Sequence, residues 1–191
     1  MSISNLFYGL NAKFKGFILK IIAYYILEPR FRSGKWQIRK DCLESLRPDI
    51  KRLYALFDKA QDFFVNLNIC SRCSGSCCYG AYNRFTVYDY IAGLINGSGT
   101  TLEWRYRLHP LWSYALNRVD KGICSYFVEG KGCSLGYTRR PAICILFYCD
   151  IIAKALTNKQ RQFLIQLKHD IDDVHWKFAK VLLSGCMKRK E

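Results

Sequence analysis

The stretch Cys70-Ser71-Arg72-Cys73-Ser74-Gly75-Ser76-Cys77-Cys78 places four cysteines within nine residues. Ordinary core packing gives no reason to crowd four thiols, so they are expected to be oxidised, bound to a metal or held ready for chemistry. Cys70 and Cys73 have the spacing at which two thiolates in a tight turn bind one metal ion. Adjacent cysteines rarely point the same way, so Cys77 and Cys78 indicate either two neighbouring centres or one ligand with a supporting thiol.

A second group of cysteines follows in a turn-rich, glycine-rich region. Its members are Cys124, Cys133, Cys144 and Cys149. Residues 123–128 and 133–137 are expected to pair as a small hairpin across the turn at 129–132. The eight clustered sulfurs suffice for two four-sulfur sites, or for one site with spare thiols.

Amphipathic helices are predicted on both sides of these cysteines. Residues 13–27 place apolar side chains on one helical face, formed by Phe14, Phe17, Ile18, Ile21, Ile22 and Tyr25. We expect this face to pack on the protein's own core, with a membrane interface as the alternative. A second helix is expected to begin at Pro48 and Asp49 and to end near Leu67, just before Cys70.

Capping signals and periodicity predict the remaining helices. Thr86 and Asp89 form a capping pattern that opens a short helix. Pro141 suits the first turn of a helix that runs to about Leu156. A long apolar face predicts a helix from Asn158 to Leu183, stopped by Gly185.

Three other segments are expected to be less regular. The basic connector around Trp36 is interpreted as a solvated linker, with single-stranded nucleic acid binding as the alternative. Residues 101–121 are consistent with a helix broken near His109-Pro110 or with an ordered loop. Lys188-Arg189-Lys190 is expected to be a loose tail.

Length and composition favour one domain. The 191 residues suffice for one sizeable core, and 50% of them are apolar. We therefore predict a mainly α single domain over 1–191, in which amphipathic helices surround a turn-rich, cysteine-ligated metal core with at most a small β-hairpin. Its parts are an N-terminal helical part (1–67), a cysteine-rich metal-binding core (68–150) and a C-terminal long helix (151–191).

Cysteine usage predicts a reducing cytoplasm. Secreted disulfide scaffolds are usually far smaller than this chain and carry a signal peptide. Here Lys13, Lys15 and Lys20 interrupt the first apolar stretch, which also excludes a transmembrane helix of about 20 apolar residues. Cys42 and Cys186 lie outside the two groups and are expected to be ordinary small core residues.

The charge predicts an acidic partner. Thirty Lys and Arg against fifteen Asp and Glu leave a formal net charge of +15. Nucleic acid, an anionic membrane surface and an acidic protein are the candidates. Part of this charge would balance a zinc held by four thiolates, which carries about −2 in total.

The cysteine order resembles the CxxCxxCC family of zinc- or iron-chelating proteins. The resemblance spans residues 70–150 and includes Cys133-x2-Gly-Tyr, Arg140-Pro141 and Phe147-x-Cys149. It implies that the metal ligands are Cys70, Cys73, Cys77, Cys78, Cys124, Cys133, Cys144 and Cys149. Ser74-Gly75-Ser76 is one residue longer than the family's spacer. Flagellin lysine N-methylases share the cysteine domain, which keeps methyl transfer as an alternative by analogy.

The predicted cofactor is an iron–sulfur cluster (4Fe–4S) or zinc, since all-thiolate ligation suits both. His109, His169 and His175 have no ligand spacing and are not expected to bind it. The sequence predicts a metal-binding protein that recruits an acidic partner. The alternatives are a metal- or cluster-dependent enzyme, such as a protein methyltransferase, and an adaptor for nucleic acid or a membrane surface. No catalytic acid–base pair stands out.

Overall fold

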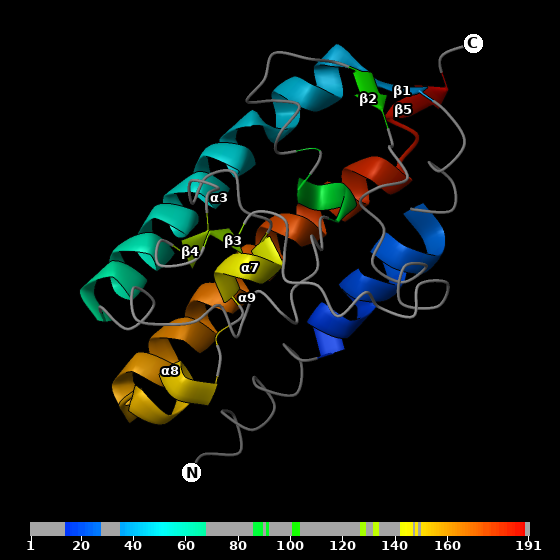
Figure 1. The fold of residues 1–191 in the computed structure, drawn as a ribbon. Coiled ribbons are helices and arrows are strands. Elements are labelled where there is room, and N and C mark those ends of the chain that lie inside the picture. Colours follow the sequence, from blue (N-terminus) through cyan, green and yellow to red (C-terminus); the bar gives the residue numbers. More distant parts are fainter. Residues whose placement is uncertain are drawn as a thin grey trace.

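Two long helices, α3 (Lys40–Leu67) and α9 (Asn158–Leu183), form the frame of the molecule. They run in opposite directions and pack along their length (Figure 1). Their facing side chains form most of the core, including Leu46, Ile50, Leu53, Phe57 and Ala60 on α3, and Leu167, Ile171, Val174, Phe178 and Leu182 on α9. These positions recur at helical spacing, so the apolar stripe of each sequence becomes the contact.

The computed structural model describes residues 14–27, 35–67, 86–89, 91, 101–103, 127–128, 132–133, 142–146, 148 and 150–189. Within this part the chain is mainly α and forms a single domain, as the sequence predicted. Residues 14–21 are α-helical and continue as the π-helix η1 (Ile22–Leu27), which packs on α9. The helices α7 (Ala142–Leu146) and α8 (Asp150–Ala155) precede α9.

The prediction for the last helix is confirmed. The Thr157 hydroxyl accepts the Gln160 amide at 3.3 Å, and the Gln160 side chain accepts the Thr157 amide at 2.8 Å, which together form a capping box. At the other end, Gly185 has φ +82°, a conformation that costs glycine little. Local sequence signals thus set both ends of α9.

The predicted start of the preceding long helix was wrong. α3 begins at Lys40 and contains Pro48 in its interior, whereas the sequence favoured Pro48 as its opening residue. A proline inside a helix removes one backbone hydrogen bond. Buried Cys42 and Leu46, before the proline, continue the apolar stripe into Ile50, so packing outweighs the lost bond.

The helix predicted from Pro141 to Leu156 is divided. α7 ends at Leu146 and α8 begins at Asp150. Ala142 and Ile145 of α7 and Ile152 of α8 are buried.

The face that the N-terminal helix presents to the core was predicted only in part. Ile22 is buried and Ile18 packs against the core, but Phe14, Phe17 and Tyr25 are exposed, and the buried side includes Leu19 and Ala23 instead. Gly16 explains why this side of the helix faces α9. A Cβ at Gly16 would lie 3.1 Å from both Asp172 Oδ2 and Lys168 Nζ of α9, so the glycine permits the close approach.

The structure contains more strand than the single predicted hairpin. β1 (Lys35–Ile38) lies between β2 (Thr101–Glu103) and β5 (Met187–Arg189) in an antiparallel sheet. Trp36 pairs in register with Leu102 and with Arg189. The described parts of the predicted linker and of the predicted loose tail are therefore strands, because each supplies the other's backbone partners.

The predicted hairpin is confirmed for the part of it that the structure describes. β3 (Phe127–Val128) pairs with β4 (Gly132–Cys133), with Phe127 opposite Cys133. Of the segment 101–121, only β2 belongs to the described residues, so the predicted break near His109-Pro110 lies outside them.

A disulfide between Cys42 and Cys186 corrects the prediction that both are ordinary core thiols. It bridges a sequence separation of 144 residues with a Cα–Cα distance of 6.0 Å. The Arg39 amide also donates to the Cys186 carbonyl at 3.0 Å. These bonds and the β1–β5 pairing hold the end of the chain against the start of α3. The predicted core location does hold for Cys42, which is 5% exposed.

Candidate metal centre

The eight cysteines of the predicted site lie in, or near in sequence to, short elements of the fold. Cys133 lies in β4 and Cys144 in α7. The other six, which are Cys70, Cys73, Cys77, Cys78, Cys124 and Cys149, lie outside the described residues. Their sequence neighbours are described, and these show which parts of the frame the two cysteine groups are attached to.

The first group follows the end of α3. Leu67 is three residues before Cys70, so the chain between them spans at most about 10 Å. Phe63 stacks on Phe163 of α9 with ring centroids 5.1 Å apart, and Phe64 is buried beside it. These rings fix the last turn of α3 against the first turns of α9, which gives the cysteine run a rigid starting point.

The second group is spread along the hairpin and α7. Cys124 is three residues before β3, and Cys149 directly precedes Asp150, the first residue of α8. Arg161 of α9 donates from Nη2 to the Ala153 carbonyl at 2.7 Å, which caps the carboxyl end of α8.

One half-buried carboxylate, Asp89, joins the segment that follows the first group to the helix of the second. Asp89 Oδ2 accepts the Thr86 amide at 2.7 Å and the Thr86 hydroxyl at 2.9 Å. Asp89 Oδ1 accepts the Ala142 amide at 2.8 Å. The chain after the Cys77-Cys78 pair is thereby joined to the first residue of the helix that contains Cys144.

The sequence predicts one of the two contacts of Asp89, the one with Thr86. The Thr86-x2-Asp89 pattern predicts a local cap, and the carboxylate does bond Thr86. The bond to Ala142 was missed, although Pro141 gives a signal for it. A proline at the start of a helix makes the next amide the first unsatisfied donor, here that of Ala142.

Burial raises the pKa of Asp89, while the amides of Ala142 and Thr86 act in the opposite direction by bonding its charged form. The pKa of Asp89 is higher in the folded chain than in the unfolded chain. As pH rises from the unfolded to the folded pKa, ionisation of this carboxyl group therefore lowers the free energy of unfolding. The three hydrogen bonds offset part of this cost. Such a carboxylate is suited to holding neighbouring segments together.

The short helical turn that contains Asp89 is itself anchored in the core. Val87, Tyr88 and Ile91 are buried, and the Tyr88 hydroxyl donates to the Leu19 carbonyl at 3.1 Å. The Tyr88 ring stacks on His175 of α9 with centroids 4.9 Å apart. Asp89 is therefore fixed from three sides, by the N-terminal helix, α9 and α7.

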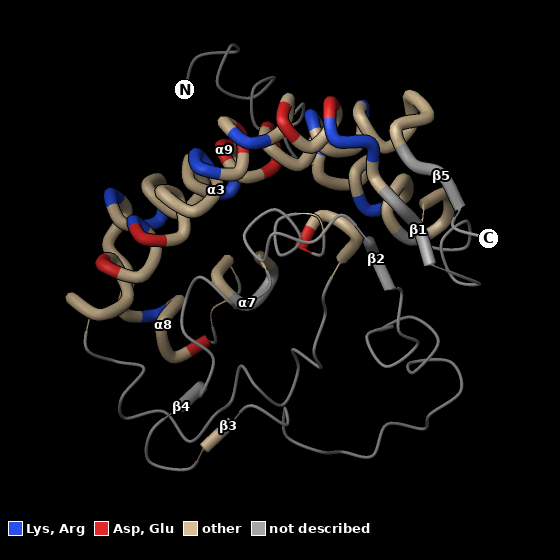
Figure 2. The backbone as a smooth tube through the Cα atoms, turned by 90° about the horizontal axis from the view of Figure 1, so that it is seen from above, with Lys and Arg blue, Asp and Glu red and all other residues tan. Residues whose placement is uncertain are grey.

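The elements next to the cysteines lie along one half of the long helices. Figures 1 and 2 both place α8 near the end where α3 stops and α9 starts, with β3 and β4 toward that end and α7 nearer the middle of α9. Seen from above, these elements lie on the same side of the layer formed by α3 and α9 (Figure 2). α7 packs against both long helices.

The described residues contain no group of three or more His, Cys, Asp or Glu side chains that could hold a metal ion. Among the histidines, His175 is buried at 7% exposure, and its Nε2 has no hydrogen-bond partner within the described part of the chain. Burial, followed by the positive charge of Lys168, lowers the pKa of His175 to about 3. It is a neutral core residue.

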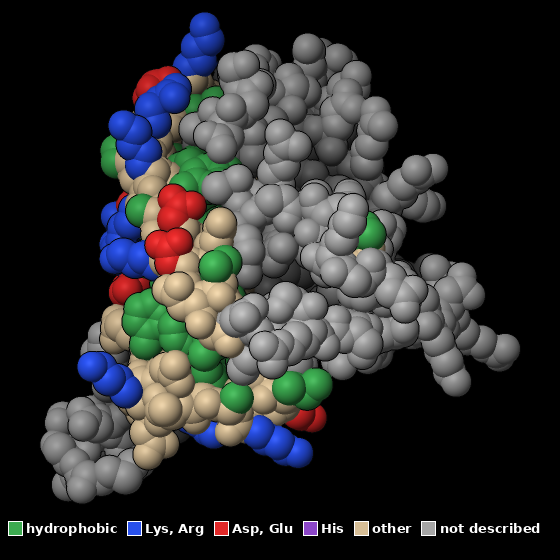
Figure 3. Space-filling model, turned by 60° about the vertical axis from the view of Figure 1, so that its left-hand side comes forward, with side chains coloured by type: hydrophobic (Ala, Val, Ile, Leu, Met, Phe, Trp, Pro, Cys, Tyr) green, Lys and Arg blue, Asp and Glu red, His purple; other side chains and the backbone are tan. Residues whose placement is uncertain are grey.

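Surface charge is mixed over the long helices. Acidic and basic side chains occur in equal numbers on α3, and several form ion pairs, such as Lys177 Nζ to Asp49 Oδ1 at 2.6 Å. Figure 3 shows blue and red side chains interspersed over this face. The excess positive charge of the chain therefore does not lie on α3. In the described part of the chain, no helix has both the length and the apolar character needed to span a membrane.

Comparison with known proteins gives no match: no family model, no curated protein and no solved structure is similar to this chain. The resemblance to the CxxCxxCC family stays a prediction from the cysteine order.

Proposed function

We propose that this chain is a metal-binding protein that holds zinc or an iron–sulfur cluster through its two cysteine groups. The observation that carries the proposal is the Asp89 carboxylate, which ties the segment after the first group to the helix of Cys144. A metal shared by the two groups requires them to be near one another, and this bond brings their flanking residues together.

The chemistry of the donor set supports the same conclusion. Eight thiols attached to short elements have little apolar surface to bury, so packing alone stabilises such a region weakly. A thiolate-bound metal supplies about 10–16 kcal/mol of folding free energy in small zinc domains. The protein's part is to fix the flanking segments, which α3, α7 and Asp89 do here.

The basic excess of the chain suits this function in two ways. Thiolate ligation leaves a metal site with negative charge, which nearby Lys and Arg stabilise. The remaining charge would recruit an acidic partner, as the net charge of +15 suggests.

We place the protein in the cytoplasm, where thiolates stay reduced and available to metal. The Cys42–Cys186 disulfide would be unusual in this compartment, because cytoplasmic disulfides are rare. In that compartment the pair is expected to be two thiols. Mass spectrometry of protein alkylated during lysis tests this, because only free thiols are alkylated. If Cys42 and Cys186 were disulfide-bonded and unalkylated in every molecule, a reducing compartment would be excluded.

Anaerobic purification followed by metal and acid-labile sulfide analysis tests the function. Zinc without sulfide, or iron with equal sulfide, is the expected result. Cys73→Ser should lower the metal content far more than Cys42→Ser, which removes a thiol outside the two groups. A folded protein with no bound metal, or equal losses in both variants, would reject the proposal.

A further inference from the structure

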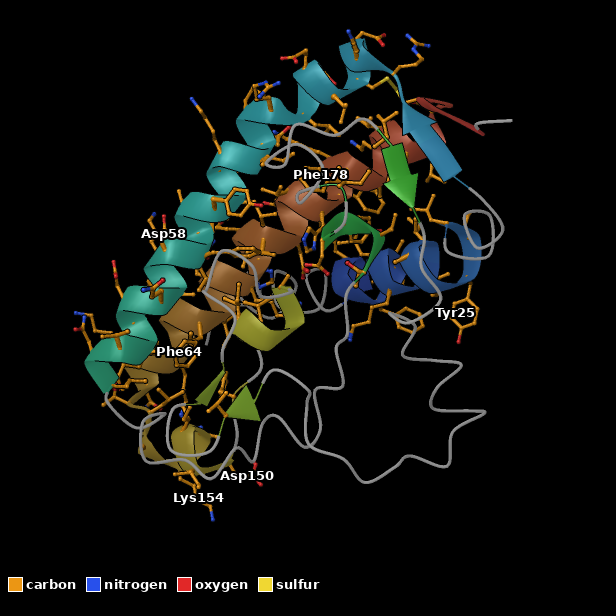
Figure 4. The ribbon with its side chains drawn as sticks, turned by 45° about the horizontal axis from the view of Figure 1, so that its top comes forward. Tyr25, Asp58, Phe64, Asp150, Lys154 and Phe178 are labelled. Carbon is orange, nitrogen blue, oxygen red and sulfur yellow. A yellow bond between two sulfur atoms is a disulfide. The ribbon has the colours of Figure 1, made fainter. Side chains whose placement is uncertain are left out.

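The helical segment 14–27 leaves an apolar, largely aromatic face in contact with solvent. Its exposed side chains and their exposed fractions are Phe14 62%, Phe17 58%, Tyr25 68% and Ile26 46%. Figure 4 shows Tyr25 pointing away from α9, out of the side of the molecule. Several large apolar side chains exposed on one helix mark an interaction surface.

Lysines border this face, and no carboxylate lies within the segment. At about 100° per residue, Lys15 and Lys20 fall on opposite edges of the face formed by Phe14 and Phe17. Lys20 is exposed, and the Lys15 side chain keeps 34% of its area exposed while it pairs with Asp173. The segment therefore offers rings in the middle, with Lys20 on one side and the Lys15–Asp173 pair on the other.

We propose that this face docks on an anionic lipid surface. Phe14, Phe17 and Tyr25 would enter the boundary between headgroups and acyl chains, where aromatic rings are favoured. Lys20 would extend along the surface to a lipid phosphate, as long basic side chains do beside apolar surface. The net charge of +15 is complementary to an anionic leaflet.

Other occupants fit the same face less well. A second copy of the chain would bring together two molecules of charge +15, and their repulsion opposes association. A nucleic acid would gain from the lysines and from ring stacking, but Ile26 has no flat surface on which a base can stack. A lipid surface uses both the apolar and the basic parts.

Co-sedimentation of the full-length chain with vesicles tests the proposal. Phosphatidylcholine vesicles containing phosphatidylserine should bind it at least about tenfold more tightly than pure phosphatidylcholine, and added salt should weaken this binding. The triple variant Phe14→Ser/Phe17→Ser/Tyr25→Ser should lose about tenfold or more in affinity, because it removes the inserted rings.

A matched control changes equally exposed apolar residues elsewhere. Ile151, Val65 and Ile165 are 55%, 61% and 48% exposed on α8, α3 and α9. Their triple replacement by Ser should leave vesicle binding within about twofold of the original, since none lies on the proposed face. Equal losses in the two triple variants would overturn the proposal.

Charge reversal gives an independent readout if the first triple variant fails to fold, as judged by circular dichroism. Lys20→Glu should weaken binding to the anionic vesicles more than Lys59→Glu, which makes the same charge change on α3. Equal effects would mean that binding follows net charge and would reject docking by this face. So would an aromatic triple variant that binds vesicles normally but changes the oligomeric state in gel filtration.

Discussion

The long helices α3 and α9 and the short elements beside the cysteines differ in what holds them in place. α3 and α9 have 28 and 26 residues, and each buries a continuous apolar stripe against the other. α7 has 5 residues and each strand of the β3–β4 hairpin has 2. The short helices α7 and α8 bury only a few side chains, Ala142, Ile145 and Ile152, and α7 is also held by the Asp89 hydrogen bond to Ala142.

This difference shows how the stability and the proposed function of the protein are divided. A long helix pair is stabilised by burial that is spread over many residues, so no single polar group decides it. A short element gains little from burial and is positioned by capping bonds or by a metal. Changes in the frame should therefore affect global stability, and changes at Asp89 should affect the metal content.

The largest effect is expected in the frame. Phe178 is 0% exposed, so Phe178→Ala should lower the free energy of unfolding by about 3–5 kcal/mol through the cavity that it leaves. Urea denaturation measures this. Phe17→Ala, at a position 58% exposed, is the control and should cost far less. If metal bound per folded molecule also fell strongly in Phe178→Ala, the division between frame and site would be wrong.

The disulfide should have the next largest effect. Loss of the Cys42–Cys186 bond should lower the free energy of unfolding of the oxidised protein by about 2–4 kcal/mol, because it closes a long loop in the unfolded chain. Reductant should therefore shift the urea midpoint of the original chain and leave that of Cys42→Ser/Cys186→Ser unchanged. A midpoint insensitive to reductant in both proteins would mean that the bond contributes nothing.

A smaller change in stability, with a larger change in metal content, is expected at Asp89. Asp89→Ala leaves the buried Ala142 amide without its acceptor, at a cost of about 1–3 kcal/mol. Metal bound per folded molecule should fall, because the segments next to the two cysteine groups lose their connection. Asp58→Ala, an exposed position on α3 (Figure 4), removes the same charge and should change neither quantity. Unaltered metal content in Asp89→Ala would mean that Asp89 does not position the metal site.

At neutral pH the smallest effect is that of His175, which acts through pH and concerns the frame alone. His175 has a folded pKa of about 3, below the 6.5 of an unperturbed histidine. Between these values the unfolded chain binds a proton that the folded chain does not, so stability falls as pH decreases from 6.5 towards 3. The slope contributed by this group approaches about 1.4 kcal/mol per pH unit.

His175→Phe should flatten the pH dependence of the urea midpoint in this range. The test also sharpens the contrast between the two regions, because metal content per folded molecule should not depend on His175. Parallel pH curves for the original chain and His175→Phe would contradict the assigned protonation.

The sequence by itself determined the features that depend on neighbouring residues. It predicted the mainly α class, the long helix Asn158–Leu183 with its glycine stop, the hairpin ahead of α7 and the Thr86–Asp89 cap. Periodicity and capping act over a few residues, so they can be read without knowledge of the fold.

Only the tertiary structure decided what depends on distant partners. Which face of residues 14–27 is buried followed from the close approach of Gly16 to α9, and Phe14 and Phe17 were left exposed. The strands β1 and β5 exist because each supplies the other's hydrogen bonds. The Cys42–Cys186 bond and the Asp89–Ala142 bond join residues far apart in the chain, and no local pattern specifies which partner a thiol or carboxylate will meet.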